Sequence, residues 1–298
     1  MINNTPLVSI GIPTYNRPEG LRKTLDCITQ QTYKNLEIIV SNNCSTNPEV
    51  EKVVNEYKER DERIKCFRQS ENIGAANNFK FVVKKATGEY FMWAADDDEW
   101  ENFYIEQLIC EFKNNKAIIA VNFEAQYTDQ TGNRFDFFSE GKPFYSFEST
   151  YPYDRLYNLL RFNYGNLVYS LYKTSALKNH DLIFVENEIP FLIKIALQGN
   201  WKVLPQIGFY KKTNPITYRQ ARWEKTGGWL PDSFYNFKHI MSLKHIYKYH
   251  KEALRYIKKS IDSIKLENNN KLKLVKLAKR LIWKHFIYIV IRYKPKPF

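Results

Sequence analysis

The sequence predicts an α/β fold, a mostly parallel sheet flanked by helices and followed by an α-helical C-terminal extension. Short apolar segments alternate with segments of helical periodicity in the first hundred residues. Beyond residue 212 long, lysine-rich segments with helical periodicity take over. We therefore expect one domain over 1–212, divided into halves 1–100 and 101–212, and a basic helical region over 213–298.

The first half should contain four strands and three helices. The strands are short apolar runs, and the helices carry apolar residues three or four positions apart, as Leu21, Leu25 and Ile28 do. Pro48 suits the first turn of the second helix. The expected strands are 7–13, 36–40, 64–68 and 90–94, and the expected helices are 19–31, 49–60 and 77–85.

The later elements follow from the same patterns. Helices are expected over 102–114, 153–162, 189–198, 233–266 and 271–292, with a polar break at 267–270. Strands are expected over 118–123, 167–172, 201–204 and 207–210, with a hairpin turn at 129–133. Gly199 is placed to end the helix that precedes it.

Composition and cysteine spacing exclude several classes of protein. The chain is 44% hydrophobic and 26% charged, which is ordinary for a folded soluble domain. The four cysteines form no CxxC pair, so neither a disulfide framework nor a zinc ribbon is expected. The apolar runs 7–13 and 286–291 are too short for a signal peptide or a membrane span. These features predict a cytoplasmic protein.

Charge is distributed unevenly along the chain. The net charge is +13, but residues 211–298 hold 22 Lys and Arg against 5 Asp and Glu, whereas the first 210 residues hold 23 against 27. In 271–292 the basic residues share one helical face and apolar residues the other, which favours contact with an anionic membrane surface. Packing of the apolar face on the protein itself or on another subunit is the alternative. No nucleic-acid-binding motif accompanies the charge.

Three expected strands end in polar loops, 14–17, 41–47 and 96–99. Open α/β sheets bind ligands beyond the carboxyl ends of their strands, so these loops should meet at one site. The last loop contains Asp96, Asp97 and Asp98 in sequence. Neighbouring carboxylates repel one another, and a hard divalent cation would compensate them and also grip phosphates. A solvated acidic loop is the alternative interpretation.

Several motifs together resemble the family 2 glycosyltransferases of GT-A fold, in particular those of bacterial polysaccharide and lipopolysaccharide synthesis. The matching segments are VSIGIPTYNR (8–17), QTY (31–33), LEIIV (36–40), NIG (72–74), ATGEY (86–90) and DDD (96–98). The match is collinear over about a hundred residues. A weaker match covers 187–199, and none is found beyond residue 212.

The resemblance implies a metal-dependent, inverting transfer of sugar from a nucleoside diphosphate. The three aspartates match the family's DxD motif, which implies that Asp98 and Asp96 bind Mn²⁺ or Mg²⁺ and that Asp96 and Asp97 face the nucleotide sugar. The resemblance also places Pro13, Thr14, Tyr15 and Arg17, as well as Asn72 and Asn77, along the nucleotide. Tyr15 would stack on the base and Arg17 would meet a phosphate, whereas Asn77 would bind either nucleotide or backbone.

Asn42 and Asn43 stand where the family's commonest version has two aspartates. In those relatives an aspartate accepts a hydrogen bond from N3–H of uracil or thymine. An asparagine carbonyl can accept that bond too, but its amide can instead donate to the bare N3 of cytosine. UDP is favoured only because uridine is the frequent base among donors of this family, and CDP and dTDP are the alternatives. An Asn-rich turn without ligand contact is the non-functional interpretation.

An inverting transfer needs a carboxylate to remove the proton of the attacking hydroxyl. Aligning Gly199 with the family pattern nominates Glu188, and a register shift of two nominates Glu186. The expected acceptor is a glycan or lipid-linked glycan at the inner face of the cell membrane, with a homo-oligomer as a possible assembly. The alternative is a catalytically silent GT-A-like module that binds a nucleotide sugar or serves as a scaffold.

Overall fold

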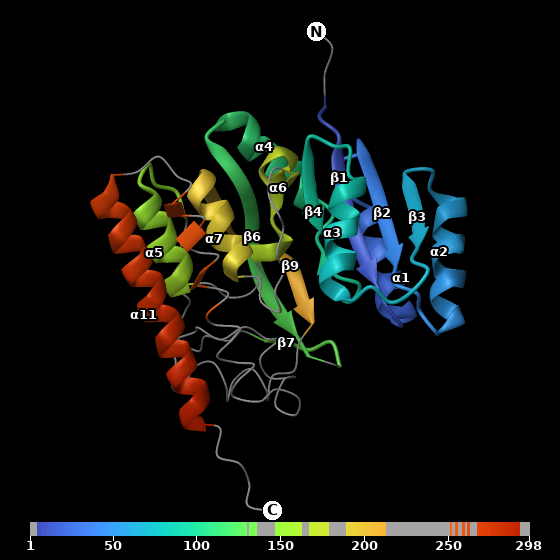
Figure 1. Cartoon of the computed structure of the whole chain (residues 1–298). Helices are drawn as coiled ribbons and strands as arrows, with labels where there is room; N and C mark the ends of the chain where they lie inside the picture. Colours follow the sequence, from blue (N-terminus) through green and yellow to red (C-terminus); the bar gives the residue numbers. More distant parts are fainter. Residues whose placement is uncertain are drawn as a thin grey trace, which may run out of the picture. The chain divides into compact units, whose positions relative to one another are not determined.

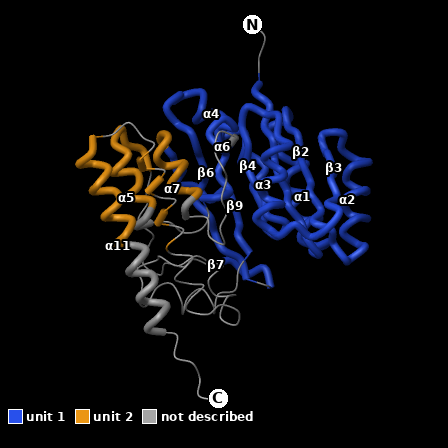
Figure 2. Tube along the Cα trace, viewed as in Figure 1, with its two compact units in different colours: residues 1–146, 166–182, 201–214 blue, residues 147–165, 183–200, 215–298 orange. Residues whose placement is uncertain are grey.

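The computed structural model describes residues 5–129, 131–135, 147–162, 167–178, 189–212 and 267–292, and separate helical positions between 251 and 262 (Figure 1). It divides into two compact units (Figure 2). The first comprises 1–146, 166–182 and 201–214, and the second comprises 147–165, 183–200 and 215–298. The long helix predicted over 233–266 falls mostly outside the described residues.

The first unit is built on a mixed sheet. Within the described residues it has nine strands in the order β3-β2-β1-β4-β8-β6-β9-β5, with β7 paired to β6. Its first strands are β1 (Val8–Thr14), β2 (Leu36–Asn42), β3 (Ile64–Arg68) and β4 (Tyr90–Trp93). These four are parallel, as predicted, while β8, β6 and β9 add antiparallel pairing.

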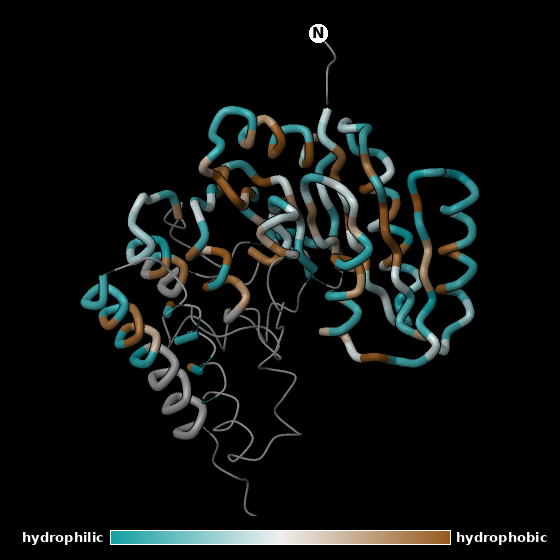
Figure 3. Tube along the Cα trace, turned by 45° about the horizontal axis from the view of Figure 1, so that its top comes forward, coloured by the Kyte–Doolittle hydropathy of each residue, from teal (hydrophilic) through white to brown (hydrophobic). Residues whose placement is uncertain are grey.

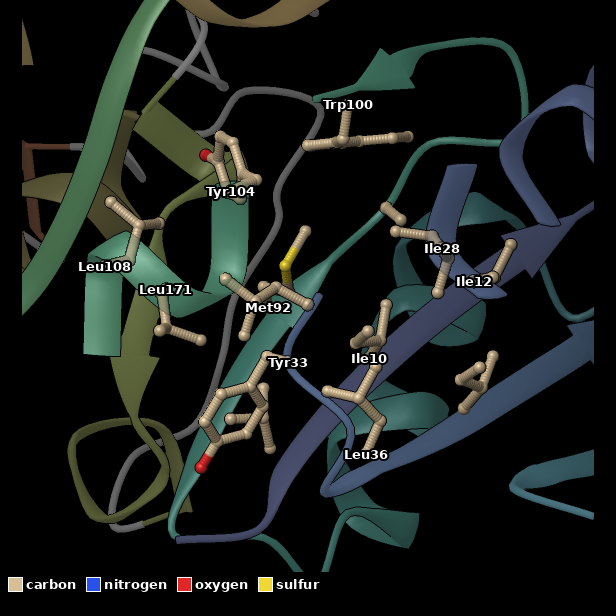
Figure 4. Packing of buried hydrophobic residues seen from close by; sticks show 14 of the residues in the cluster. Ile10, Ile12, Ile28, Tyr33, Leu36, Met92, Trp100, Tyr104, Leu108 and Leu171 are labelled. Carbon is tan, nitrogen blue, oxygen red and sulfur yellow. The ribbon is translucent and has the colours of Figure 1, made fainter. Parts of the chain in front are cut away.

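Helices cover both faces of the parallel part. They are α1 (Pro18–Thr29), α2 (Pro48–Arg60) and α3 (Ala75–Lys85), all close to the predicted ranges. Every residue of β1 and β2 is buried, as expected for parallel strands with helices on both sides. Ile10 and Ile12 of β1 pack in one cluster with Ile28 of α1 (Figure 4). Colouring by hydropathy shows brown and teal stretches alternating along the chain (Figure 3).

The remaining strands of the first unit complete the sheet, and two further helices and a 3₁₀ turn connect them. They are β5 (Glu99–Trp100), α4 (Tyr104–Asn114), β6 (Ile118–Thr128), β7 (Arg134–Phe135), the 3₁₀ turn η1 (Leu167–Tyr169), β8 (Leu171–Lys173), α6 (Thr174–Lys178) and β9 (Asn200–Lys212). The predicted hairpin is confirmed, because β6 and β7 pair antiparallel on either side of the turn.

The strand predicted over 167–172 is wrong in its first half. The carbonyl of Leu167 accepts hydrogen bonds from the Ser170 backbone N–H at 3.1 Å, the Ser170 hydroxyl at 2.7 Å and the Tyr172 hydroxyl at 2.5 Å. These local bonds compete with extended backbone and close a 3₁₀ turn. The strand therefore begins only at Leu171.

The two short strands predicted over 201–204 and 207–210 form the single strand β9. Pro205, which lies within β9, is exposed and can be accommodated where no ladder donor is needed. Gly208 allows β9 to lie close to β6, because an added Cβ would come within 2.6 Å of the Phe123 ring. β9 also pairs with β5, a strand that begins in the predicted acidic loop.

The described part of the second unit is mainly helical. It contains α5 (Pro152–Phe162), α7 (Ile189–Gln198) and α11 (Asn268–Arg292), and α5 contacts both of the others. Leu274 and Ala278 of α11 are buried, while Leu272 is half exposed. Among the helices that the structure describes, none is long and apolar enough to cross a membrane.

Candidate functional site

The acidic turn follows β4 at the carboxyl end of the parallel strands. Strand pairing continues to Ala94, whose N–H donates to the Gly11 carbonyl at 2.9 Å. The hydroxyl of Thr24 on α1 then donates to the carbonyls of Ala95 at 2.9 Å and Asp98 at 3.1 Å. The start of α1 also presses against the turn, because a Cβ on Gly20 would lie 2.2 Å from the Asp96 carbonyl oxygen. Helix α1 therefore holds the turn in place.

Asp96 is almost fully buried and binds the loop after β1. Its Oδ2 accepts hydrogen bonds from the Thr14 hydroxyl at 2.8 Å and from the Tyr15 N–H at 3.4 Å. Its Oδ1 lies 3.0 Å from Nη1 of Arg17. Burial raises the pKa of Asp96 even though the Arg17 charge favours the ionised form. The structure thus brings together Asp96 and the three predicted residues of the first loop.

Arg17 lies between two carboxylates. Its Nη1 is 3.0 Å from Asp96 Oδ1 and 2.8 Å from Asp97 Oδ2, and its side chain is 57% exposed. In the described structure Arg17 therefore neutralises the acidic turn, whereas the resemblance had placed it on a phosphate. An exposed arginine of this kind can exchange one oxyanion partner for another.

Asp98 is 2% exposed, and its Oδ1 accepts a hydrogen bond from the Lys212 N–H at 2.9 Å. Burial, and next the charge of Asp97, raise the pKa of Asp98 to about 8, while the charge of Lys211 opposes the rise. A carboxylate that is so costly to ionise in its present surroundings gains strongly from a nearby cation. The lysine backbone contact joins the acidic turn to the end of β9.

The two carboxylates suit a hard divalent cation whose remaining ligands come from phosphate and water. Two buried carboxylates, Asp96 and Asp98, lie on one turn. Among the described residues no group of three or more His, Cys, Asp and Glu is placed to hold a metal ion. Mg²⁺ is commonly held by one or two carboxylates, with substrate phosphates and water completing the octahedron. The two aspartates therefore fit such an ion only together with a phosphorylated ligand.

Asn42 is locked within the loop after β2. Its Oδ1 accepts from the Ser45 N–H and its Nδ2 donates to Glu51 Oε2, both at 2.9 Å. Arg68 also binds that Glu51 oxygen, at 3.0 Å. The side chain of Asn42 is 1% exposed. The structure thus places Asn42 in the scaffold of the loop.

Asn43 is bound to the loop that follows β3. Its Oδ1 accepts from the Ile73 N–H at 3.0 Å, and its Nδ2 donates to Asn72 Oδ1 at 2.9 Å. Asn72 Oδ1 also accepts from the Gly74 N–H at 2.9 Å. The backbone N–H of Asn43 donates to the Thr14 carbonyl at 2.9 Å, which connects the pair to the first loop.

The other predicted residues have separate surroundings. Pro13 is buried on β1 beside Ser41, and Tyr15 is 40% exposed, so its ring is accessible to a stacking partner. The Asn77 amide donates to the Ile73 carbonyl at 2.8 Å and so binds backbone in this structure. Glu188 and Glu186 both lie outside the described residues.

The sequence prediction overlooked several residues that shape the site. Asn16 has a positive φ of 57°, accepts from the Asn47 N–H at 3.0 Å, and donates its own N–H to Ser45 Oγ at 3.0 Å. Asparagine before a helix is a weak signal for such a conformation. No pattern along the chain could indicate Lys212, because it contributes a backbone group from more than a hundred residues away.

Comparison with known proteins gives a consistent result. The family model for "Glycosyl transferase family 2" matches residues 9–179. Glycosyltransferase GlyA of Streptococcus pneumoniae is 32% identical over 177 residues, which cover 59% of this chain and 23% of GlyA. The putative teichuronic acid biosynthesis glycosyltransferase TuaG of Bacillus subtilis is 31% identical over 107 residues, 36% of this chain and 42% of TuaG. The chain thus spans less than half the length of these two relatives.

Two solved structures share the fold at low sequence identity. S. aureus TarS in complex with UDP-GlcNAc superposes with a TM-score of 0.66 at 17% identity, covering 94% of this chain and 73% of the TarS chain. The mannosyltransferase PcManGT of Pyrobaculum calidifontis, in complex with GDP-Man and Mn²⁺, gives a TM-score of 0.54 at 16% identity, covering 96% of this chain and 83% of its own.

Proposed function

This chain belongs to glycosyl transferase family 2, and we propose that it transfers a sugar from a nucleoside diphosphate donor to a hydroxyl of a growing, lipid-linked surface glycan. The pair of buried carboxylates at the carboxyl end of β4 carries the proposal, because Asp96 and Asp98 suit a cation that must also hold a diphosphate. The similarity to TuaG, named as a putative teichuronic acid biosynthesis glycosyltransferase, supports a polysaccharide acceptor.

Departure of a nucleoside diphosphate leaves at least two negative charges to be stabilised. A bound Mn²⁺ or Mg²⁺ held by Asp96 and Asp98 would supply that neutralisation as a Lewis acid. The complex of PcManGT with Mn²⁺ supports a divalent ion in this fold, and the complex of TarS with UDP-GlcNAc favours a uridine donor by likeness.

The residues of the chain would divide the remaining work. Thr14 and the Tyr15 N–H hold the Asp96 carboxylate in one orientation. Arg17, which is exposed on one side, would move from Asp97 to a phosphate oxygen when the donor binds. Glu188, with Glu186 as the alternative, would remove the proton of the acceptor hydroxyl as it attacks the anomeric carbon with inversion.

Helix α11 would bring the enzyme to the inner face of the membrane. Lys273, Lys276 and Arg280 are all exposed along its first half. Leu274 and Ala278 are buried in the same stretch, so here the apolar side is packed within the protein. The proposed membrane contact therefore relies on the basic side chains, each of which contributes roughly 1 kcal/mol near an anionic leaflet.

Thermal unfolding with nucleotides tests the donor site. UDP, CDP, GDP and dTDP are added with and without Mn²⁺, because a ligand that binds only the folded chain raises its melting temperature. We expect a Mn²⁺-dependent rise with one nucleotide that is lost in Asp98→Asn. This substitution keeps the shape of the side chain and removes the ionised carboxylate that would bind the metal. Asp262→Asn, on an exposed side chain, is the control and should keep the full rise.

Each outcome discriminates between the two functions considered. Absence of a rise with any nucleotide would contradict the donor site. A rise without sugar transfer to any glycan acceptor would favour a catalytically silent nucleotide-sugar-binding module. An equal rise in Asp98→Asn would show that the acidic turn does not hold the cation.

A further inference from the structure

Asn43 and Asn72 form a pair of amides at the carboxyl ends of two neighbouring parallel strands. Asn43 follows β2 and Asn72 follows β3, and the Asn43 amide donates to the Asn72 carbonyl oxygen at 2.9 Å. Asn43 is 3% exposed, whereas Asn72 is exposed. A backbone hydrogen bond from Asn43 to Thr14 connects the pair to the loop that binds Asp96.

The orientation of both amides follows from hydrogen-bond chemistry. Asn43 Oδ1 accepts from the Ile73 N–H, and Asn72 Oδ1 accepts from the Gly74 N–H. A backbone N–H can only donate, so turning either amide round would place two donors face to face. The oxygen of each side chain therefore faces a backbone N–H of the loop, and this fixes which end of each amide carries the NH₂ group.

A count of the remaining hydrogen-bonding capacity shows that the pair mainly donates. Among the described residues, Asn43 uses one of its two amide hydrogens and Asn72 uses none, while the oxygens already accept one and two hydrogen bonds respectively. Three amide hydrogens thus remain against one oxygen lone pair. Where an aspartate would offer a second oxygen, this chain offers N–H.

We propose that the amide pair selects a base whose Watson–Crick edge carries an unprotonated ring nitrogen, and that the donor is a cytidine diphosphate sugar. The inference rests on the proposed function and deepens it. Cytosine presents N3 and O2 as neighbouring acceptors, which suit amide hydrogens. Uracil presents N3–H between its two carbonyl groups, and an amide N–H opposite this group would leave both donors unsatisfied.

The neighbouring asparagine does not change this chemistry. The Asn42 amide donates to Glu51, and its oxygen accepts from the Ser45 N–H. By the same count Asn42 keeps one amide hydrogen and one oxygen lone pair, so this residue favours neither cytosine nor uracil. The likeness to TarS favours uridine, whereas the amide pair, which belongs to this chain, favours cytidine.

Isothermal titration calorimetry on the full chain with saturating Mn²⁺ tests the selection. CDP, UDP, dTDP, GDP and ADP are compared as ligands. We expect CDP to bind at least about tenfold more tightly than UDP, because a bound UDP would place its ring N–H against the N–H groups of Asn43 and Asn72 and leave these donors without acceptors. Tightest binding of ADP would overturn the assignment of a cytidine diphosphate sugar, although adenine also carries an unprotonated ring nitrogen on its Watson–Crick edge.

The opposite results are equally specific. UDP, dTDP or GDP binding as tightly as CDP, or more tightly, would overturn the selection while leaving the proposed function intact, because all three carry a ring N–H on that edge. No binding by any nucleotide would reject the proposed function and the selection together. The two failures are therefore distinguishable.

Two variants assign the selection to the amide pair. Asn43→Asp and Asn72→Asp each keep an oxygen for the backbone N–H and replace the NH₂ by a second oxygen. Each is expected to lower the ratio of CDP to UDP affinity about tenfold or more. If Asn43→Asp, at the buried position, prevents folding, Asn72→Asp at the exposed position still tests the proposal. An unchanged ratio in a folded variant would overturn the proposal.

The matched control is Asn35→Asp. This exposed asparagine donates its amide to the Thr5 carbonyl before the start of β2, away from the carboxyl ends of the strands. The same change of amide to carboxylate at this position should leave the ratio of CDP to UDP affinity as in the unmodified chain.

Discussion

Replacing Glu37 by glutamine is expected to lower the free energy of unfolding by about 3 kcal/mol at pH 7. Glu37 lies on β2 and is 3% exposed. Its carboxylate accepts hydrogen bonds from the Ser9 hydroxyl, from the Thr87 hydroxyl at 2.9 Å and from the Gly88 N–H at 3.0 Å. Lys65 Nζ lies 2.9 Å from the other oxygen. Because donors face both carboxylate oxygens, a glutamine in either orientation would place its NH₂ group against a donor.

The magnitude follows from the ionisation of Glu37. Burial alone raises its pKa, but the hydrogen bonds from Ser9, Lys65 and Thr87 outweigh burial and lower the pKa from 4.5 to about 2. A fall of that size is worth about 3 kcal/mol at pH 7. Because the folded-state pKa is the lower one, the stabilisation is fully present above pH 4.5 and is lost as the pH falls towards 2.

Urea unfolding followed by circular dichroism at pH 7 and pH 3 checks this prediction. The difference between the unmodified chain and Glu37→Gln should shrink by about 2 kcal/mol between the two pH values, since the unfolded carboxyl is protonated at pH 3. Glu62→Gln, on an exposed side chain, should cost less than about 0.5 kcal/mol at both. A difference that stays constant between pH 3 and 7 would refute the reasoning.

Two further substitutions test the second unit and the proposed base. Arg155 is 5% exposed and donates to the carbonyls of Ser149, Ala196 and Leu197. Arg155→Met should leave these carbonyls without a donor and lower the free energy of unfolding by about 2–4 kcal/mol, measured by thermal unfolding. An unchanged melting temperature would contradict this. Glu188→Gln should slow sugar transfer about 10²–10⁴-fold in initial-rate assays with unchanged nucleotide affinity, and a loss confined to Glu186→Gln instead would reassign the base.

The parallel strands could be predicted because their burial is visible in the sequence. A strand covered on both faces is mostly apolar, as 36–40 is apart from Glu37, and a helix must repeat its apolar residues every three or four positions. The acidic turn could be predicted for a related reason: polar residues that directly follow a buried strand emerge at the edge of the sheet where ligands bind.

The antiparallel part was less predictable because local and long-range contacts decide it together. Leu167 was expected in a strand, but bonds from Ser170 and Tyr172 close a turn there. β9 was expected as two strands, but it continues past Pro205 and pairs with β5. Side-chain periodicity carries no information about such pairing partners.

The sequence by itself determined which chemical groups reach the candidate site, because residue type and strand-end position are local properties. It placed Thr14, Arg17 and the three aspartates at one edge of the sheet. Only the tertiary structure decided what each group touches: Arg17 lies on Asp96 and Asp97, and the Asn43 oxygen faces the Ile73 N–H. Hydrogen bonds between loops depend on the distance and direction of groups far apart in the chain, and these exist only once the sheet has brought its strands together.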